Sequence, residues 1–309
     1  MLRTELKKLW DQSPPLTATA ILMLVTFVAS CVGIFADPRI ITGMPAWLKP
    51  AKFAISIAIF SASIAWLFRY VQIWPRFKRI SGWILTIVLI TELVLIDVQA
   101  ARGTTSHFNA ATPADIALFG IMGAMIFVLW LVSAAIAVML FKQPFADRTW
   151  GWSLRLGMLI SVIGAATGGM MLGPTSEQLA TIRAHEKVTA IGGHTVGAPD
   201  GGPGIPGVGW STEHGDLRIP HFLGLHALQI IPFIGWRISR RRGSPRMVFV
   251  AAASYLAFAI ILAWQALRGQ SIVDPDSVTL LAFAAWLVAS IIGFAWSARP
   301  SHAVMTARA

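Results

Sequence analysis

The run ADIALFGIMGAMIFVLWLVSAAIAVMLF, residues 114–141, decides the class of fold because it is one long apolar stretch with a single charged side chain, Asp115. A helix that crosses a bilayer needs roughly 20 consecutive, mainly apolar residues. A surface helix of a soluble protein would carry polar residues on one face. The run therefore predicts a membrane-spanning helix.

Seven further apolar runs lie on either side of this one, and prolines, which are tolerated at helix ends, separate them. We expect an all-α membrane protein of a single domain, residues 1–309, built as an antiparallel bundle of about eight transmembrane helices with one long outer Gly/Pro-rich loop. The expected spans are residues 16–35, 53–73, 80–100, 114–141, 152–173, 219–236, 247–267 and 277–296.

The composition agrees with a chain that is mainly surrounded by lipid. Hydrophobic residues make up 56% of the sequence and charged residues only 13%, whereas soluble domains are typically about 25% charged. The formal net charge of +11 would suggest nucleic acid in a soluble protein, but here the charges lie in short loops between apolar runs. We therefore expect membrane lipids and no nucleic acid as partners. A single cysteine, Cys31, excludes an internal disulfide and a cysteine-based zinc site.

Lysine and arginine are distributed unequally between the two sets of loops. If the N-terminus is cytoplasmic, 17 of the 25 basic residues lie in cytoplasmic segments and eight in outer segments. Cytoplasmic loops carry an excess of Lys and Arg. The bias predicts that both termini are cytoplasmic, and together with the short loops it favours a bacterial inner (plasma) membrane.

Glycine has two different roles in the second half of the sequence. Gly164, Gly168, Gly169 and Gly173 form overlapping small-xxx-small pairs in the fifth span, a pattern typical of close helix contact and a possible oligomer face. The long connection at about 174–218 is rich in Gly and Pro between residues 192 and 209. A connection this long is usually a lid or a disordered segment. We expect a lid over the outer mouth of the bundle, with residues 175–187 as a short amphipathic helix.

Six of the seven histidines fall on or near the outer face in this topology. His226 lies roughly 10 Å along the sixth span from its outer start, inside the outer leaflet. An ionisable side chain there is costly and marks a candidate functional site. His221 is five residues earlier, about 140° around the helix. We expect His226 to point into the bundle and His221 to lie at the membrane interface.

The third span carries the other polar groups of the membrane interior, Glu92, Asp97 and Gln99. Buried carboxylates in lipid either pair with another group or hold a proton. Glu92 and Asp97 are therefore the candidate catalytic or proton-relay residues. The alternative interpretation is structural: an Asp97–Arg102 or a Glu92–Gln99 contact that ties helices together.

Four strings resemble segments of a group of bacterial polytopic integral membrane proteins that have no assigned activity. They are ARGTTSHFN (101–109), GGHTVG (192–197), GDLR (215–218) and PHFLGLH (220–226). The resemblance implies a multi-pass membrane protein and no particular mechanism. The His221–His226 spacing departs from the HxxxH of alkaline-ceramidase-type lipid hydrolases, and the 13–14-residue histidine spacing of dihaem b-type cytochromes is missing.

Three functions remain open. The first is a redox protein, an oxidoreductase that binds a single haem b or another transition metal near the outer face, with quinone as a possible partner. His107, His185 and His226 are its candidate cofactor ligands, and His107, His221 and His226 the candidate metal ligands. The second is a proton-coupled transporter or small-solute channel that uses Glu92, Asp97 and His226; no internal repeat supports it. The third is a metal-dependent membrane hydrolase with ligands such as His107, His226 and Asp97. A structural or sensory subunit without a site is the remaining possibility.

Overall fold

The structure, a computed structural model, describes residues 2–299 and contains eight helices that are long and apolar enough to cross a membrane. Every predicted span overlaps one of them, so the expected all-α membrane bundle is confirmed and the chain is a multi-pass membrane protein. The spans are α2 (Pro14–Ala36), α3 (Leu48–Leu67, continued by the 3-10 turn η1, Phe68–Tyr70), α4 (Pro75–Ala101), α5 (Pro113–Lys142), α6 (Arg148–Ala166, continued by η2, Thr167–Met171), α8 (Arg218–Arg240), α9 (Pro245–Leu267) and α10 (Ser277–Ser297).

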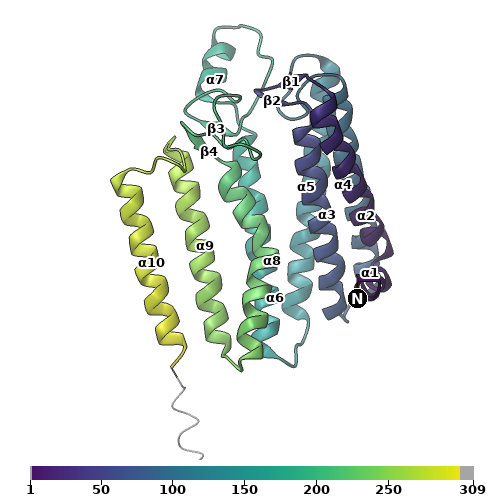
Figure 1. Cartoon of the computed structure of the whole chain (residues 1–309), viewed down its shortest axis with the longest axis vertical. Coiled ribbons are helices and arrows are strands. Elements are labelled where there is room, and N and C mark those ends of the chain that lie inside the picture. Colours follow the sequence, from purple (N-terminus) through teal and green to yellow (C-terminus); the bar gives the residue numbers. More distant parts are fainter. Residues whose placement is uncertain (1, 300–309) are drawn as a thin grey trace, which may run out of the picture.

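The short elements lie at the two ends of the bundle, which Figure 1 shows from the side. We call the end with helix α1 the N-terminal end, and the opposite end, which the 174–218 segment covers, the loop end. Because the number of spans is even, the last span, α10, ends at the N-terminal end. The Arg240–Arg242 turn lies at the same end. The short elements are α1 (Leu2–Gln12), α7 (Ser176–Arg183) and two hairpins, β1 (Ile40–Ile41) with β2 (Met44–Pro45), and β3 (Thr195–Val196) with β4 (Gly215–Asp216).

Local sequence determines where the spans begin. Proline occupies the first turn of α2, α4, α5 and α9, where its fixed φ suits a helix and its missing N–H is not needed. Thr112 and Asp276 cap α5 and α10 by accepting a hydrogen bond from a backbone N–H three residues on. The predicted helix at 175–187 forms as α7, behind a capping box of Thr175 and Gln178.

The spans form two groups in Figure 1. Helices α2 to α5 pack against one another, as do α6, α8, α9 and α10, and the α5–α6 contact joins the two groups. Helices α6 and α8 form the most extensive contact between any two spans. There Gly164 faces Gly224 so closely that a Cβ on Gly164 would lie 2.3 Å from the Gly224 Cα. The predicted role of Gly164 in close helix contact is therefore confirmed, whereas Gly169 and Gly173 face open space.

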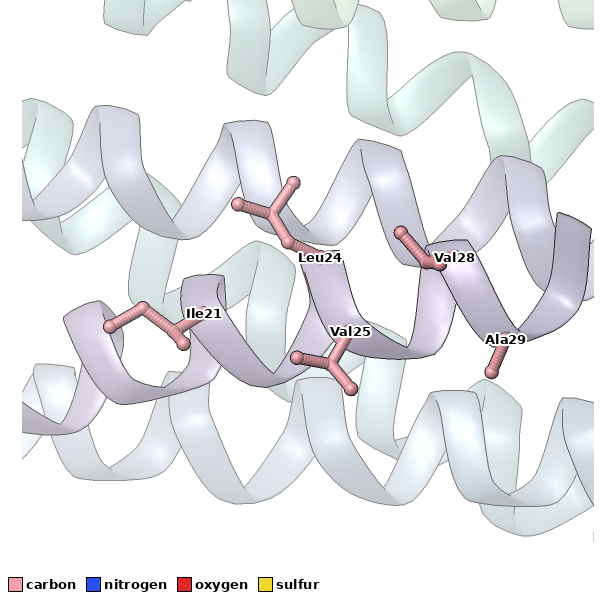
Figure 2. Close-up of a pocket in the computed structure, with 5 residues that line it drawn as sticks. All are labelled: Ile21, Leu24, Val25, Val28 and Ala29. Carbon is pink, nitrogen blue, oxygen red and sulfur yellow. The ribbon is translucent and has the colours of Figure 1, made fainter.

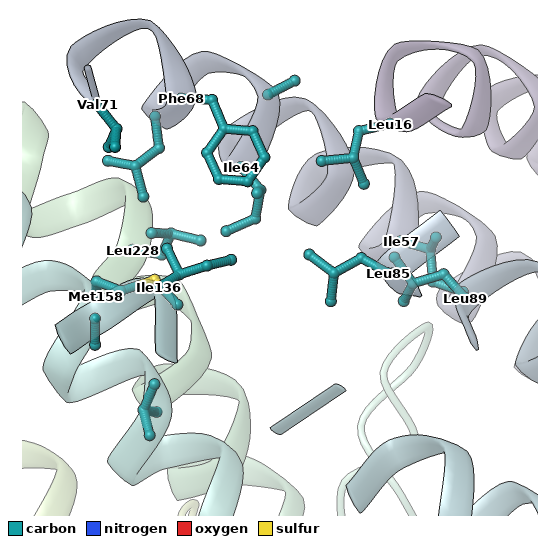
Figure 3. Packing of buried hydrophobic residues seen from close by; sticks show 14 of the residues in the cluster. Leu16, Ile57, Ile64, Phe68, Val71, Leu85, Leu89, Ile136, Met158 and Leu228 are labelled. Carbon is teal, nitrogen blue, oxygen red and sulfur yellow. The ribbon is translucent and has the colours of Figure 1, made fainter. Parts of the chain in front are cut away.

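An apolar cluster fills the interior of the bundle, and Figure 3 shows part of it. Its side chains come from both groups of helices, among them Ile64 and Phe68, Ile136, Met158 and Leu228. Because all five are almost fully buried, they close much of the space between the two groups.

The outer surfaces of the helices are apolar, as a lipid-facing surface should be. Figure 2 shows an example, a shallow hollow of about 530 Å³ along α2 that contains no polar side chain. Its lining residues are Ile21, Leu24, Val25, Val28 and Ala29.

Candidate functional site

Glu92 occupies the buried face of α4. Leu85, Leu89, Glu92 and Ile96 recur at the spacing of one helix face, and all are buried. The Glu92 side chain is only 1% exposed, and neither carboxyl oxygen makes a hydrogen bond within residues 2–299. Burying a carboxyl group without a partner is costly. The group therefore needs a proton, an ion or a ligand, which makes Glu92 the leading candidate for a functional residue.

His107 is the titratable side chain that contacts Glu92. It lies in the loop after α4, and its Nε2 is 3.4 Å from Glu92 Oε1. Its Nδ1 is 3.1 Å from Ser106 Oγ, and the ring packs against Phe53 and Phe119. Burial lowers the pKa of His107 well below its ordinary value of 6.5, and the positive charge of Lys49 acts in the same direction. The imidazole is therefore neutral at pH 7 and can accept or pass on a proton.

Lys49 is the basic side chain at this place. It lies in the first turn of α3, with its ammonium group 5.9 Å from the centre of the Phe53 ring. Its charge acts on the Glu92 carboxyl group. Within the described residues Lys49 has no carboxylate within salt-bridge distance. Glu92, His107 and Lys49 thus form one group, which we call the acid–base cluster.

A second histidine–carboxylate pair lies in the 174–218 segment, next to this cluster. His194 Nδ1 is 2.6 Å from Asp200 Oδ2, and Asp200 also accepts hydrogen bonds from the backbone N–H groups of His194 and Thr195. Although burial opposes ionisation, these bonds hold the pKa of Asp200 well below its usual range. Burial lowers the pKa of His194, against the opposing pull of Asp200. The His194 ring packs on Phe108, which adjoins His107.

The 174–218 segment is fastened to both groups of helices. Lys52 of α3 donates a hydrogen bond to the Val208 carbonyl, at 3.0 Å. On the other side, Ser271, beyond α9, donates one to the Ser211 carbonyl. Gly43 of the β1–β2 turn approaches the segment so closely that a Cβ would lie 2.6 Å from a backbone oxygen, and its φ of +73° also requires glycine. The segment therefore covers the loop end as an ordered structure.

Asp97 and Arg102 do not form the predicted tie. Arg102 instead pairs with Asp115 of α5 at 2.8 Å, and Gln99 donates to the same carboxylate at 2.9 Å. Gln99 is thereby also unavailable to Glu92. The predicted Asp97–Arg102 and Glu92–Gln99 contacts were wrong, because the Arg102 and Gln99 side chains both bind Asp115 in the first turn of α5. Asp97 Oδ1 is buried and has no hydrogen-bond partner in the part of the chain that the structure describes.

The two histidines of α8 point in different directions. His221, expected at the membrane interface, lies against α6, where its Nδ1 donates to the Gly164 carbonyl at 2.9 Å. His226 lies on the face toward α3, with its Nδ1 3.2 Å from Gln229 Oε1. Gln229 in turn donates to Ser63 of α3 at 2.9 Å. His221 thus serves helix packing, whereas His226 belongs to a polar contact between the two groups of helices.

The candidate metal and haem ligands have different neighbours. His107 packs on Phe53 and contacts Glu92, whereas His226 contacts Gln229 within its own helix. His185 is exposed just beyond the end of α7. Among residues 2–299, no group of three or more His, Cys, Asp or Glu side chains is placed to hold a metal ion. The structure therefore brings together Glu92 and His107 and leaves the other predicted ligands apart.

Lys49, Asp115 and the His194–Asp200 pair were missed as site residues by reasoning from the sequence. The sequence offers a weak indication for Lys49, since it is a basic residue next to the start of a span. It offers no indication that Asp200 contacts His194, because that contact depends on the path of a glycine-rich turn. Comparison with known proteins adds no relative: no protein family, no curated protein and no solved structure matches the chain.

Proposed function

We propose that the protein is a proton-coupled transporter of small solutes in a bacterial inner membrane, with the N-terminal end in the cytoplasm and the loop end outside. One observation carries the proposal: Glu92, inside a spanning helix, has no hydrogen-bond partner among the described residues for either carboxyl oxygen and lies 3.4 Å from His107. Ionisable groups in membrane helices commonly mark proton and solute pathways. The excess of basic residues at the N-terminal end supports the orientation.

The acid–base cluster offers a way to couple a proton to a solute. A neutral His107 can take a proton from water at the loop end and pass it to Glu92. Protonated Glu92 no longer carries the negative charge that acts on Lys49. The electrostatic environment of the Lys49 side chain then changes, so the cluster binds a solute differently in its two protonation states. A ligand that distinguishes two states shifts the equilibrium between them.

The rest of the path follows the contact between the two groups of helices. From the loop end inward, Phe222, His226 and Gln229 share one face of α8, and Gln229 reaches Ser63 of α3. Buried apolar side chains lie directly beside this polar contact, among them Ile64 of α3 and Leu228 of α8. A polar contact enclosed by apolar side chains suits a transporter in a closed state. Movement of one group of helices against the other would open it.

Transport accounts for this arrangement better than the redox and hydrolase alternatives do. Both alternatives need several ligands around one metal, and the described residues contain no group of three or more His, Cys, Asp or Glu side chains placed to hold one. A proton-coupled transporter needs a buried titratable group that can exchange a proton. The Glu92–His107 contact supports such a role.

The test is an uptake experiment in liposomes. The purified protein is reconstituted, a pH gradient is imposed, and the vesicles are incubated with a mixture of small metabolites. Mass spectrometry then identifies solutes that accumulate only with both protein and gradient. We expect at least one such solute, and we expect Glu92→Gln to abolish its gradient-driven uptake because an amide cannot carry the proton.

Glu177→Gln is the matched control, since it removes an exposed carboxyl group of α7 at the same end of the protein. It should leave uptake unchanged. If no solute accumulates above the level of empty liposomes, or if Glu92→Gln takes up solute as the unmodified protein does, the proposal is wrong.

A further inference from the structure

The N-terminal end of the bundle carries a groove of about 440 Å³ that the proposed transport function does not use. It lies where α6 and α9 begin and where α10 has just ended, the lower ends of these helices in Figure 1. Its lining residues are Arg148, Ser244, Pro245, Arg246 and Arg299. Three guanidinium groups therefore face one small space.

The three guanidinium groups have no hydrogen-bond or carboxylate partner in the described part of the chain. None donates a hydrogen bond there, and none has a carboxylate within 4.0 Å. The nearest acidic residue in sequence, Asp147, is engaged elsewhere, since it accepts hydrogen bonds from the Ser239 hydroxyl and from the Trp150 backbone N–H. Within the described residues, the positive charge of the groove is therefore not neutralised by a carboxylate.

The start of α9 adds two hydrogen-bond donors to these charges. Ser244 stands at the N-cap, yet its side chain caps no backbone N–H. Its Oγ is buried and has no hydrogen-bond partner in residues 2–299. Pro245 follows as the first helical residue, so the Arg246 N–H is the first free donor at the positive end of the helix dipole. A hydroxyl, a backbone N–H and three guanidinium groups around one space suit a phosphate group.

The surroundings of the groove indicate that the phosphate group belongs to a lipid headgroup. The groove lies at the end of spanning helices, and exposed apolar side chains of α9 and α10 adjoin it on the membrane side, among them Phe249, Ile292 and Trp296. Arg246 also lies over the Trp296 ring, 5.9 Å from its centre. Acyl chains would follow these side chains while the headgroup fills the groove. We propose that this arginine groove binds the phosphodiester headgroup of an anionic phospholipid.

The proposal is tested by native mass spectrometry of the full-length protein, titrated separately with phosphatidylglycerol and with phosphatidylcholine of the same acyl chains. We expect one phosphatidylglycerol to bind with at least tenfold preference over phosphatidylcholine. Arg148→Gln combined with Arg246→Gln should weaken that binding by about tenfold or more, as for the loss of charge-assisted hydrogen bonds. The matched control, Arg241→Gln with Arg242→Gln, removes the same charge from exposed positions at the same end. It should change the affinity less than twofold.

A third variant covers the case in which the double variant does not fold. Ser244→Asp improves the cap of α9 and places a negative charge in the groove, so it should keep the fold and lose the lipid. Three results would overturn the proposal: equal weakening in both double variants, equal affinity for the two lipids, or unchanged binding by Ser244→Asp. Competition by inorganic phosphate without any binding of phosphatidylglycerol would assign the groove to a free anion and also overturn it.

Discussion

Arginines at the two ends of the bundle have different partners, although both ends lie beside the membrane. At the loop end, four of the five arginines pair with an aspartate. These pairs are Arg39–Asp37, Arg102–Asp115, Arg218–Asp216 and Arg268–Asp276, and only Arg183 stands apart. At the N-terminal end, no arginine of the described residues forms a salt bridge. The paired arginines hold protein segments together. At the N-terminal end, Arg155 donates hydrogen bonds to backbone carbonyls, whereas exposed arginines such as Arg241 and Arg242 remain available to ligands or lipid.

The same comparison sets Glu92 apart. The carboxylates of Asp115, Asp200 and Asp216 at the loop end each accept several hydrogen bonds. Glu92 is as buried as they are or more so, and it accepts none among the described residues. Carboxylates that stabilise structure are bonded, so the exception points to a group whose protonation changes during function.

Arg218→Gln should have the largest effect on stability. The variant leaves the Asp216 carboxylate, whose side chain is fully buried, without its counter-ion, and breaking a buried pair in this way typically costs about 3–5 kcal/mol. We expect a clear fall in the thermal midpoint in detergent. Asp216→Asn with Arg218→Gln should recover part of the loss, because no buried charge then remains. A single variant as stable as the unmodified protein would contradict the structural role of the loop-end pairs.

Acidification should have the second-largest effect, and it should destabilise the loop end. Burial lowers the pKa values of His107 and His194 below 6.5, so the unfolded chain binds protons that the folded chain does not. Stability should therefore rise with pH as pH passes upward through the range below 6.5. Asp200 acts differently, because its lowered pKa keeps its contribution until pH falls below the ordinary value of 3.8.

The measurement for this prediction is the thermal midpoint as a function of pH. His107→Gln, which cannot take up the extra proton, should flatten the profile between pH 5 and 7 relative to the unmodified protein. Identical profiles for the two proteins would show that His107 does not titrate as its surroundings indicate.

Lys52→Met should have a smaller and local effect. It removes the hydrogen bond to the Val208 carbonyl, which is worth about 1 kcal/mol. We expect faster hydrogen exchange in residues 195–216 with little change in the thermal midpoint. Faster exchange throughout α3 would instead mean that Lys52 supports the helix itself.

Arg241→Gln, at the N-terminal end, should have the smallest effect. This exposed side chain has no salt-bridge partner among the described residues, and substitutions of this kind usually change stability by less than about 0.5 kcal/mol. A midpoint shift as large as that of Arg218→Gln would remove the distinction between the two ends.

The spans and the burial of Glu92 could be predicted from the sequence because both depend on local periodicity. Apolar runs separated by prolines identify the helices, and the spacing of Leu85, Leu89 and Glu92 places the carboxyl group on the inner face. The partners could not be predicted, because loops bring them together. Arg102 turns toward Asp115 of the next helix, and Asp200 reaches His194 through a glycine-rich turn. Neither contact follows a fixed sequence spacing.

The proton-binding role of Glu92 is tested most directly by infrared spectroscopy of the protein in membranes. A carboxyl group that exchanges protons with water gives a C=O stretching band that changes with pH and shifts in deuterated water. We predict such a band in the unmodified protein and its loss in Glu92→Gln, with Glu177→Gln unchanged. A carboxyl band that responds to neither pH nor deuterated water, or one that persists in Glu92→Gln, would contradict the account.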